Sequence, residues 1–208
     1  MSTFSTDCRK CKRLAEFLDE VKEKNPDYFA LPVPAYGAKN AKLLIVGLAP
    51  GMHGANRTGR PFTGDFAGVL LYETLHEFGF SNKSESISLD DGLKLKNCRI
   101  TNAVKCLPPQ NKPTGEEINI CNSFLAEELD TLKKGSVIIA LGSIAHNAVL
   151  KAKGLKLSQY KFGHNVQHDL DNVTLIDSYH CSRYNTQTKR LTPAMFKDVF
   201  KAARKILG

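Results

Sequence analysis

Three segments of the chain bring together residue types that take part in catalysis. The first spans residues 47–65; it holds five glycines and two prolines, includes His53, and ends on the carboxylate of Asp65. The second contains Asn102, and the third begins at His180. A carboxylate can stabilise positive charge, a carboxamide offers a donor and an acceptor, and an imidazole can donate a hydrogen bond. These segments are therefore the candidates for a chemical site.

The glycine-rich first segment has a rival interpretation, because its backbone N–H groups could face a phosphate. However, it lacks both the Gly-Lys-Ser/Thr end of a Walker loop and the G-x-G-x-x-G dinucleotide fingerprint. Structural roles are also open for its polar residues. Asp65 can cap the helix that follows, and His53 can be a loop histidine. Likewise, Asn102 can satisfy backbone groups at the end of a strand.

The six cysteines suggest a metal site, because four of them form two spaced pairs. The pairs are Cys8 with Cys11 and Cys106 with Cys121. Four thiolates suit either zinc or an iron–sulfur cluster, and the spacing alone does not choose between them. Cys98 opens a predicted strand and is expected to be a small core residue. No role is assigned to Cys181.

The elements that must position these residues alternate between strands and helices. Apolar runs ended by glycine or polar residues predict strands at 42–46 (continuing to Gly47), 99–104, 136–141 and 173–176. Helical periodicity and capping residues predict helices at 9–24, 66–78, 114 to about 134, and from Thr192 to the C-terminus. The alternation predicts one α/β domain over residues 1–208, with a mostly parallel sheet between two helical layers.

Polar segments follow the predicted strands at residues 48–65, 105–113 and 180–191. Ligands of parallel sheets bind beyond the carboxyl ends of the strands, so these segments are expected to meet on one face. Residues 81–95 are expected to form an exposed polar loop.

The composition is that of an ordinary globular protein, with 42% hydrophobic and 24% charged residues. This excludes a disordered or fibrous chain. Lysine and arginine total 29 against 21 acids, a net charge of +8, which favours a polyanionic partner. The first twelve residues are polar, and no apolar run is long enough to cross a membrane. We therefore expect an intracellular protein, cytoplasmic or nucleoid-associated, with no membrane partner.

Three runs of sequence carry a resemblance to a known family. GLAPGMHGANRTGRPFTGD (47–65), ITNAVKC (100–106) and HCSRYNTQTKRLT (180–192) resemble the motifs of the uracil-DNA glycosylase superfamily. The chain is most similar to its family 5, the iron–sulfur type also called type b, from Cys8 to the last helix. The resemblance implies the fold of that superfamily and a DNA repair enzyme. Such an enzyme flips uracil, and other deaminated bases such as hypoxanthine and xanthine, out of DNA and hydrolyses the N-glycosidic bond, leaving an abasic site.

The resemblance also implies roles for individual residues. Asp65 would position water or stabilise the sugar cation, and His180 would donate to the departing base. Phe62 would stack on the base, Asn102 would read its edge, and Gly47 and His53 would line or support the substrate site. In the third run, Arg183, Tyr184 and Asn185 would form the loop that enters the DNA minor groove.

Some positions depart from better-known relatives. Leu48 and Ala49 stand where many superfamily members carry Asp, Asn or Glu. Family 5 shares this apolar character, and the resemblance to it implies that Asp65 is the catalytic carboxylate. Cys181 and Arg183 replace two prolines that are frequent in the third motif, and Lys189 replaces a frequent glycine. We expect these differences to affect substrate range and DNA affinity more than the reaction.

By the same resemblance, Cys8, Cys11, Cys106 and Cys121 would hold a [4Fe–4S] cluster that ties the N-terminal helix to the domain. The partner would be DNA containing uracil or other deaminated bases, and a monomer is expected. The alternative function is a non-catalytic iron–sulfur or zinc protein that binds nucleic acid. A phosphate-binding nucleotidase is less well supported, because the sequence shows no metal-binding acidic cluster.

Overall fold

The computed structural model describes residues 4–208, and its centre is a six-stranded sheet in the order β1-β3-β2-β4-β6-β5. Strands β3, β2, β4 and β6 run parallel, whereas β1 and β5 pair antiparallel at the two edges. The strands are β1 (Tyr36–Gly37), β2 (Leu43–Gly47), β3 (Cys98–Asn102), β4 (Ser136–Leu141), β5 (Gln167–Leu170) and β6 (Val173–Ser178). The mostly parallel sheet predicted from the sequence is confirmed.

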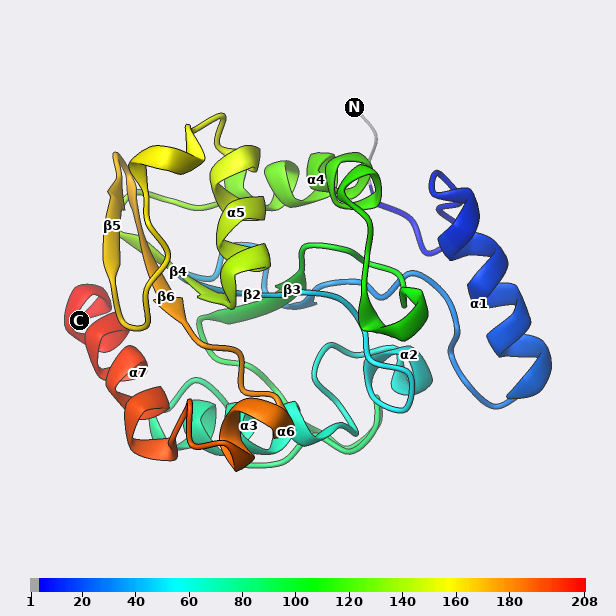
Figure 1. The fold of residues 1–208 in the computed structure, drawn as a ribbon. Helices are drawn as coiled ribbons and strands as arrows, with labels where there is room; N and C mark the ends of the chain where they lie inside the picture. Colours follow the sequence, from blue (N-terminus) through cyan, green and yellow to red (C-terminus); the bar gives the residue numbers. More distant parts are fainter. Residues whose placement is uncertain (1–3) are drawn as a thin grey trace.

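Helices cover both faces of this sheet, as Figure 1 shows. α3 (Phe66–Glu77) and α7 (Pro193–Leu207) pack on one face, and α4 (Gly115–Asp130) and α5 (Ser143–Ala152) pack on the other. The three-layer α/β/α architecture predicted from the sequence is therefore confirmed.

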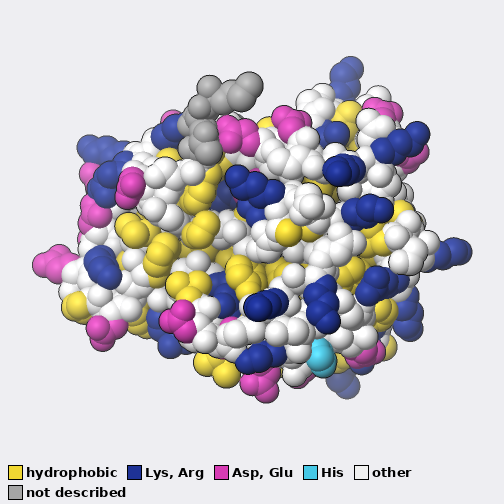
Figure 2. Space-filling view, turned by 180° about the vertical axis from the view of Figure 1, so that it is seen from behind, with side chains coloured by type: hydrophobic (Ala, Val, Ile, Leu, Met, Phe, Trp, Pro, Cys, Tyr) yellow, Lys and Arg dark blue, Asp and Glu magenta, His cyan; other side chains and the backbone are white. Residues whose placement is uncertain are grey.

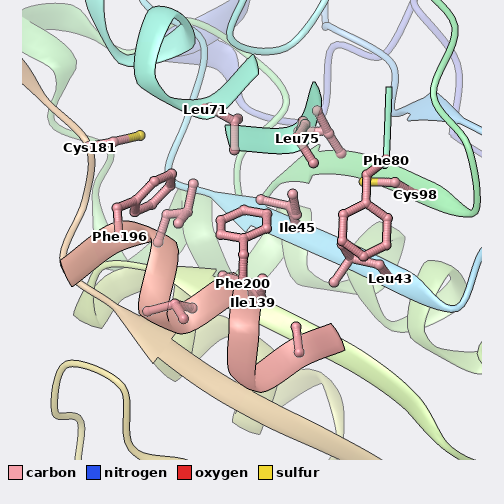
Figure 3. Packing of buried hydrophobic residues seen from close by; sticks show 14 of the residues in the cluster. Leu43, Ile45, Leu71, Leu75, Phe80, Cys98, Ile139, Cys181, Phe196 and Phe200 are labelled. Carbon is pink, nitrogen blue, oxygen red and sulfur yellow. The ribbon is translucent and has the colours of Figure 1, made fainter. Parts of the chain in front are cut away.

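The layer formed by α3 and α7 contains the larger apolar core (Figure 3). Phe196 and Phe200 of α7 lie against Ile45 and Ile139, which point from β2 and β4 to this face. Side chains alternate along a strand, so Val46 points into the layer of α4 and α5. Because both faces are covered, every residue of β2 and β4 is buried, which explains their unbroken apolar runs.

The predicted helix starts are present because each is made by local hydrogen bonds. Thr114 and Glu117 form a capping box at the start of α4, and the hydroxyl of Thr192 accepts from the amide of Met195. α4 ends at Asp130 and not near residue 134, since the hydroxyl and amide of Thr131 both bond back to Glu128 O. α1 (Lys12–Lys24) begins three residues later than predicted, because Cys11 has an extended backbone.

Several short elements were not predicted from the sequence. α5 follows Gly142, whose φ of 98° starts the helix without a side-chain cap. β5 reads QHDL and is mostly exposed, so it carries no apolar signal. α2 (Ala55–Thr58) and α6 (Arg183–Gln187) are too short for helical periodicity to show.

Residues 81–95, predicted to be an exposed polar loop, are exposed only in part. Ile87 and Leu89 are exposed, but Ser81 and Leu95 form an isolated antiparallel bridge. The buried guanidinium of Arg60 donates to both carboxylate oxygens of Asp91 at 2.9 Å. This ion pair fixes the loop to the glycine-rich first segment.

α1 packs outside the three layers, against the segment after β3 and against α4. Leu14, Leu18 and Val21 form its buried face, and the guanidinium of Arg13 donates to both oxygens of Glu117 on α4 at 2.7 Å. Within residues 4–208, no helix combines the length and the apolar character that crossing a membrane requires.

Candidate functional site

A pocket of about 440 Å³ opens at the carboxyl edge of the sheet. The segments after β2, β3 and β6 all line it, as expected from the polar residues that follow those strands. Phe62, Asp65, Asn102, His180 and Arg183 are among the lining residues, so the structure brings these predicted site residues together. The volume suits a small heterocyclic ligand.

The floor of the pocket is built by a close approach of three residues. A Cβ atom on Gly47, the last residue of β2, would lie 2.4 Å from Asn102 Oδ1 and 2.6 Å from Phe62 Cζ. Phe62 is held over this glycine with a φ of 55°. Asn102 is buried, and its Oδ1 has no hydrogen-bond partner among the described residues. A buried carboxamide oxygen without a partner is costly, so this atom is available to a ligand.

His180 forms one side of the pocket, where its ring stacks on Phe62 with centroids 5.9 Å apart. Asn185 Nδ2 donates to the carbonyl of His180 at 2.8 Å, which fixes the backbone. Desolvation lowers the pKa of His180 to about 4. The ring is therefore neutral near pH 7 and can donate only one hydrogen bond to a ligand or neighbour.

Asp65 both caps helix α3 and lines the pocket. Its Oδ1 accepts from the amide of Gly68 at 2.8 Å, which caps α3 as one interpretation of the sequence expected. Its Oδ2 lies against Gly54, where a Cβ atom would approach it to 2.5 Å. Burial raises the pKa of Asp65, partly offset by backbone N–H groups that stabilise the anion. Because the start of α3 fixes one oxygen of this carboxylate, the group is held in an orientation from which it can stabilise a positive charge in the pocket.

Other predicted residues lie at the rim of the pocket or outside it. Arg183 lines the pocket, with its guanidinium 5.1 Å from the ring centre of Phe66. Tyr184 is 71% exposed beside it on α6. His53 is exposed, does not line this pocket, and shares a 2.7 Å hydrogen bond with the hydroxyl of Tyr28.

Asn111 lines the pocket, although no motif in the sequence singled it out. It follows Gln110, and both residues have a left-handed backbone, with φ values of 57° and 55°. Two consecutive left-handed residues reverse the chain and carry Asn111 to the pocket. The only sequence signal was the polar character of residues 105–113.

The four paired cysteines converge as predicted, at a cavity between α1, the end of the second motif and α4. Burial, together with the nearby thiols and carboxylates, raises the pKa of Cys11 to about 11, and burial raises that of Cys106 as well. Lys105 N–H donates to Cys121 Sγ at 3.3 Å. Thiolates at this position therefore need a positive centre to stabilise them.

The positions of the free sulfur atoms can be compared with the spacing that a single metal ion requires. Among residues 4–208, no three cysteine sulfurs lie within 4.8 Å of one another. Four thiolates on one zinc ion would lie about 3.8 Å apart, given a Zn–S bond of about 2.3 Å. The described residues that line the cavity offer four thiols and no histidine or carboxylate, a donor set that suits an iron–sulfur cluster and a zinc ion alike.

Comparison with known proteins gives information on the family of the chain that is independent of this geometry. Residues 34–204 match the family model described as the uracil DNA glycosylase superfamily. The chain belongs to this superfamily. Its resemblance to family 5 is confirmed by curated relatives named type-5 uracil-DNA glycosylase. The protein from Thermus thermophilus is 46% identical over 209 residues, which cover 98% of this chain and 95% of the relative. The one from Pyrobaculum aerophilum is 42% identical, covering 94% and 87%.

More distant relatives in the superfamily agree. A type-4 uracil-DNA glycosylase from Thermotoga maritima is 32% identical and covers 80% of this chain and 78% of the relative. The crystal structure of SMUG2 from Pedobacter heparinus matches with a TM-score of 0.50 at 17% identity, covering 80% of this chain and 76% of that one. The structural match supports the superfamily fold.

Proposed function

We propose that this superfamily member excises uracil from DNA by flipping the base into the pocket and hydrolysing its N-glycosidic bond. The observation that carries the proposal is the buried, unpartnered Oδ1 of Asn102, in one pocket with Phe62, Asp65 and His180. A non-catalytic nucleic-acid-binding protein has no need of a buried, unsatisfied amide beside a carboxylate. Flipping is required because the reacting bond of a stacked base lies out of reach.

Base recognition follows from the chemistry of the pocket floor. The Asn102 carboxamide can accept from N3–H of uracil and donate to its O4. Stacking on Phe62 contributes about 1–3 kcal/mol and tolerates different bases. The apolar Leu48 and Ala49 also line the pocket and offer no polar side chain that would reject a larger base. We therefore extend the proposal to hypoxanthine and xanthine.

The reaction produces positive charge on the sugar and negative charge on the base, and the pocket offers one group to stabilise each. As the bond between C1′ and the base nitrogen breaks, its electron pair leaves with the base, and positive charge develops on the sugar. The Asp65 carboxylate stabilises that cation and orients the water that adds to C1′. The neutral His180 ring donates a hydrogen bond to O2 of the departing anion. Hydroxyl from water ends on the sugar and the proton ends on the base, leaving an abasic site.

The remaining predicted groups complete the proposal. Arg183 and the exposed Tyr184 on α6 are placed to enter the minor groove and fill the gap left by the flipped base. Cys8, Cys11, Cys106 and Cys121 would hold a [4Fe–4S] cluster. The cluster would supply a covalent link between α1 and the body of the protein. We also propose that the enzyme acts as a monomer.

A glycosylase assay with matched variants tests this function. The iron-loaded protein is incubated with a uracil-containing duplex, and alkali then cleaves any abasic site. Asp65→Asn keeps a side-chain cap for α3 but removes the charge, so we expect a rate loss of about 10²- to 10³-fold with little loss of stability. Asn102→Ala and His180→Ala should lose activity on the same scale. Lys133→Gln, at an exposed lysine that lies before β4 and does not line the pocket, is the control and should cleave like wild type.

Two results would contradict the proposal. One is a wild-type protein that leaves no abasic site in uracil-containing DNA. The other is a set of Asp65, Asn102 and His180 variants that all cleave at the wild-type rate. The first outcome would favour the non-catalytic alternative, and the second would show that these three residues are not the catalytic groups.

A further inference from the structure

Three side chains outside the pocket, two of them buried and one partly buried, converge from three elements. Asp177, near the end of β6, is fully buried. Its Oδ1 lies 2.7 Å from Nδ1 of His146 on α5, and its Oδ2 lies 3.0 Å from Nε2 of His168 on β5. Asp177 is three residues before His180, so the end of β6 connects this cluster to the segment that lines the pocket.

The distances between these atoms are those of hydrogen bonds and are too short for ligands of one metal ion. Two ligand atoms on one zinc ion lie about 3.3 Å apart, whereas His146 Nδ1 and Asp177 Oδ1 are 2.7 Å apart. Nε2 of His146 faces the carbonyl oxygen of Tyr160 at 3.0 Å, and that oxygen can only accept. Both ring nitrogens of His146 therefore face oxygen acceptors, an arrangement that favours the imidazolium form. Burial opposes this charge, but the Asp177 carboxylate outweighs it and raises the pKa of His146.

Asp177 also forms hydrogen bonds to the segment of residues 160–166, through its carboxylate and its backbone. Its Oδ2 also accepts from the amide of Gly163 at 3.3 Å. Its carbonyl accepts from the amide of Asn165 at 2.8 Å, and its own amide donates to the carbonyl of Val166 at 3.0 Å. The segment between these contacts carries His164, which the cluster therefore holds in place.

His164 connects this segment to the peptide before His180. Its Nδ1 accepts from the amide of Tyr179 at 3.2 Å, and its Nε2 donates to the carbonyl of Met195 at 3.2 Å. The ring also stacks on Tyr179, with centroids 5.0 Å apart. These two bonds require a neutral ring with hydrogen on Nε2 only, and burial lowers the pKa of His164 in agreement.

We propose that His164 is a positioning residue for His180, and that the His146–Asp177–His168 cluster holds His164 in the required place. By accepting from Tyr179 N–H and donating to α7, His164 sets the direction in which the chain delivers the next side chain, His180, toward Phe62. The inference rests on the proposed function for its kinetic consequence, but the hydrogen-bonding pattern stands independently of that function.

Two substitutions of the same residue separate positioning from general packing. In His164→Asn, Oδ1 takes the place of Nδ1 and still accepts from Tyr179 N–H. In His164→Gln, the side-chain amide reaches the place of Nε2 and donates to Met195 O, but nothing accepts from Tyr179 N–H. Both variants remove the ring and its stacking. We expect His164→Asn to keep kcat for uracil excision within about threefold of wild type, and His164→Gln to lose about tenfold with KM unchanged, as for one lost buried hydrogen bond. Equal losses in both variants, or no loss in either, would overturn the proposal.

A second measurement reads the hydrogen-bonding pattern without activity. Two-bond ¹H–¹⁵N correlation spectra of the holoprotein at pH 7 should show His164 neutral with hydrogen on Nε2 and His146 doubly protonated. Asp177→Asn should return His146 to a neutral ring and shift the resonances of His164 and His180. A charged His164, a neutral His146 in wild type, or no shift at His180 would refute the proposal. A wild-type protein that shows the expected pattern but does not excise uracil would instead contradict the proposed function alone.

Discussion

At the scale of single residues, the pocket depends on the lack of a Cβ atom at Gly47. Gly47 has no side chain, so Asn102 Oδ1 and the Phe62 ring occupy the space where a Cβ atom would be. The two groups proposed to read and stack on the base thus meet at the end of β2. The glycine is required by this close approach, and no positive φ is involved at this position.

Gly47→Ala should therefore damage the site directly. The new methyl group would lie 2.4 Å from Asn102 Oδ1, and that side chain and Phe62 must shift. We expect kcat/KM for uracil excision to fall at least about tenfold and the free energy of unfolding to fall by about 1–3 kcal/mol, as for other overpacked cores. Single-turnover kinetics and urea unfolding measure the two effects.

Gly115→Ala is the matched control for that substitution. A Cβ atom at Gly115, in the first turn of α4, meets nothing within 4 Å. It should leave the rate unchanged and the stability equal to or slightly above that of wild type. A Gly47→Ala protein with wild-type kinetics would show that the floor is not part of the substrate site.

At the scale of elements, local signals in the sequence were reliable and long-range contacts were not visible. The capping box of Thr114 and Glu117 involves residues three apart, so the sequence alone predicts the start of α4. The buried runs of β2 and β4 are equally local. By contrast, β5 is held by pairing with β6, and its polar sequence gives no sign of a strand.

The candidate site follows the same division. Its convergence was predictable, because the carboxyl ends of parallel strands meet at one edge and the polar residues follow the strands. The close approach at Gly47, the left-handed turn that brings in Asn111 and the pairing of Asp177 with His146 were not predictable. Each depends on how segments distant in sequence are placed in three dimensions.

α1 is the element that the cysteine centre should control. It packs on the body through a few apolar residues, the Arg13–Glu117 ion pair and the cysteines at its start. We expect removal of iron by a chelator, or Cys11→Ala, to abolish the visible absorption near roughly 400 nm. The amides of α1 should then exchange hydrogen faster than those of β2 and β4, because the link between α1 and α4 is lost.

Cys98→Ala serves as the control for this prediction. Cys98 is fully buried in β3, in the core cluster of α3 and α7 and apart from the cysteine centre. Its loss should lower stability but retain iron and the visible absorption. A colourless wild-type protein that binds one zinc ion would contradict the cluster, and unchanged α1 exchange after iron removal would contradict its role as a link.

At the scale of the whole molecule, the net charge of +8 is not confined to the pocket side. Figure 2, seen from behind Figure 1, shows lysine and arginine side chains scattered over the face that it presents, with acidic side chains among them. Only those near the pocket can contact a duplex whose base enters it. Lys133 and Lys134 are exposed and directly precede β4, so they lie at the opposite edge of the sheet from the pocket. The number of phosphate contacts is therefore smaller than the total charge of the protein would suggest.

The salt dependence of DNA binding should distinguish these two sets of charges. Each phosphate contact contributes about 0.9 to the slope of log K against log salt concentration. With a uracil-free duplex, Arg183→Gln should reduce the magnitude of that slope by about one, because Arg183 lies at the mouth of the pocket. Lys133→Gln and Lys134→Gln remove equal charge at the far edge and should leave the slope unchanged. If the lysine variants lower the slope as much as Arg183→Gln does, the duplex must bind over a different face of the protein, and the pocket cannot be where it delivers its base.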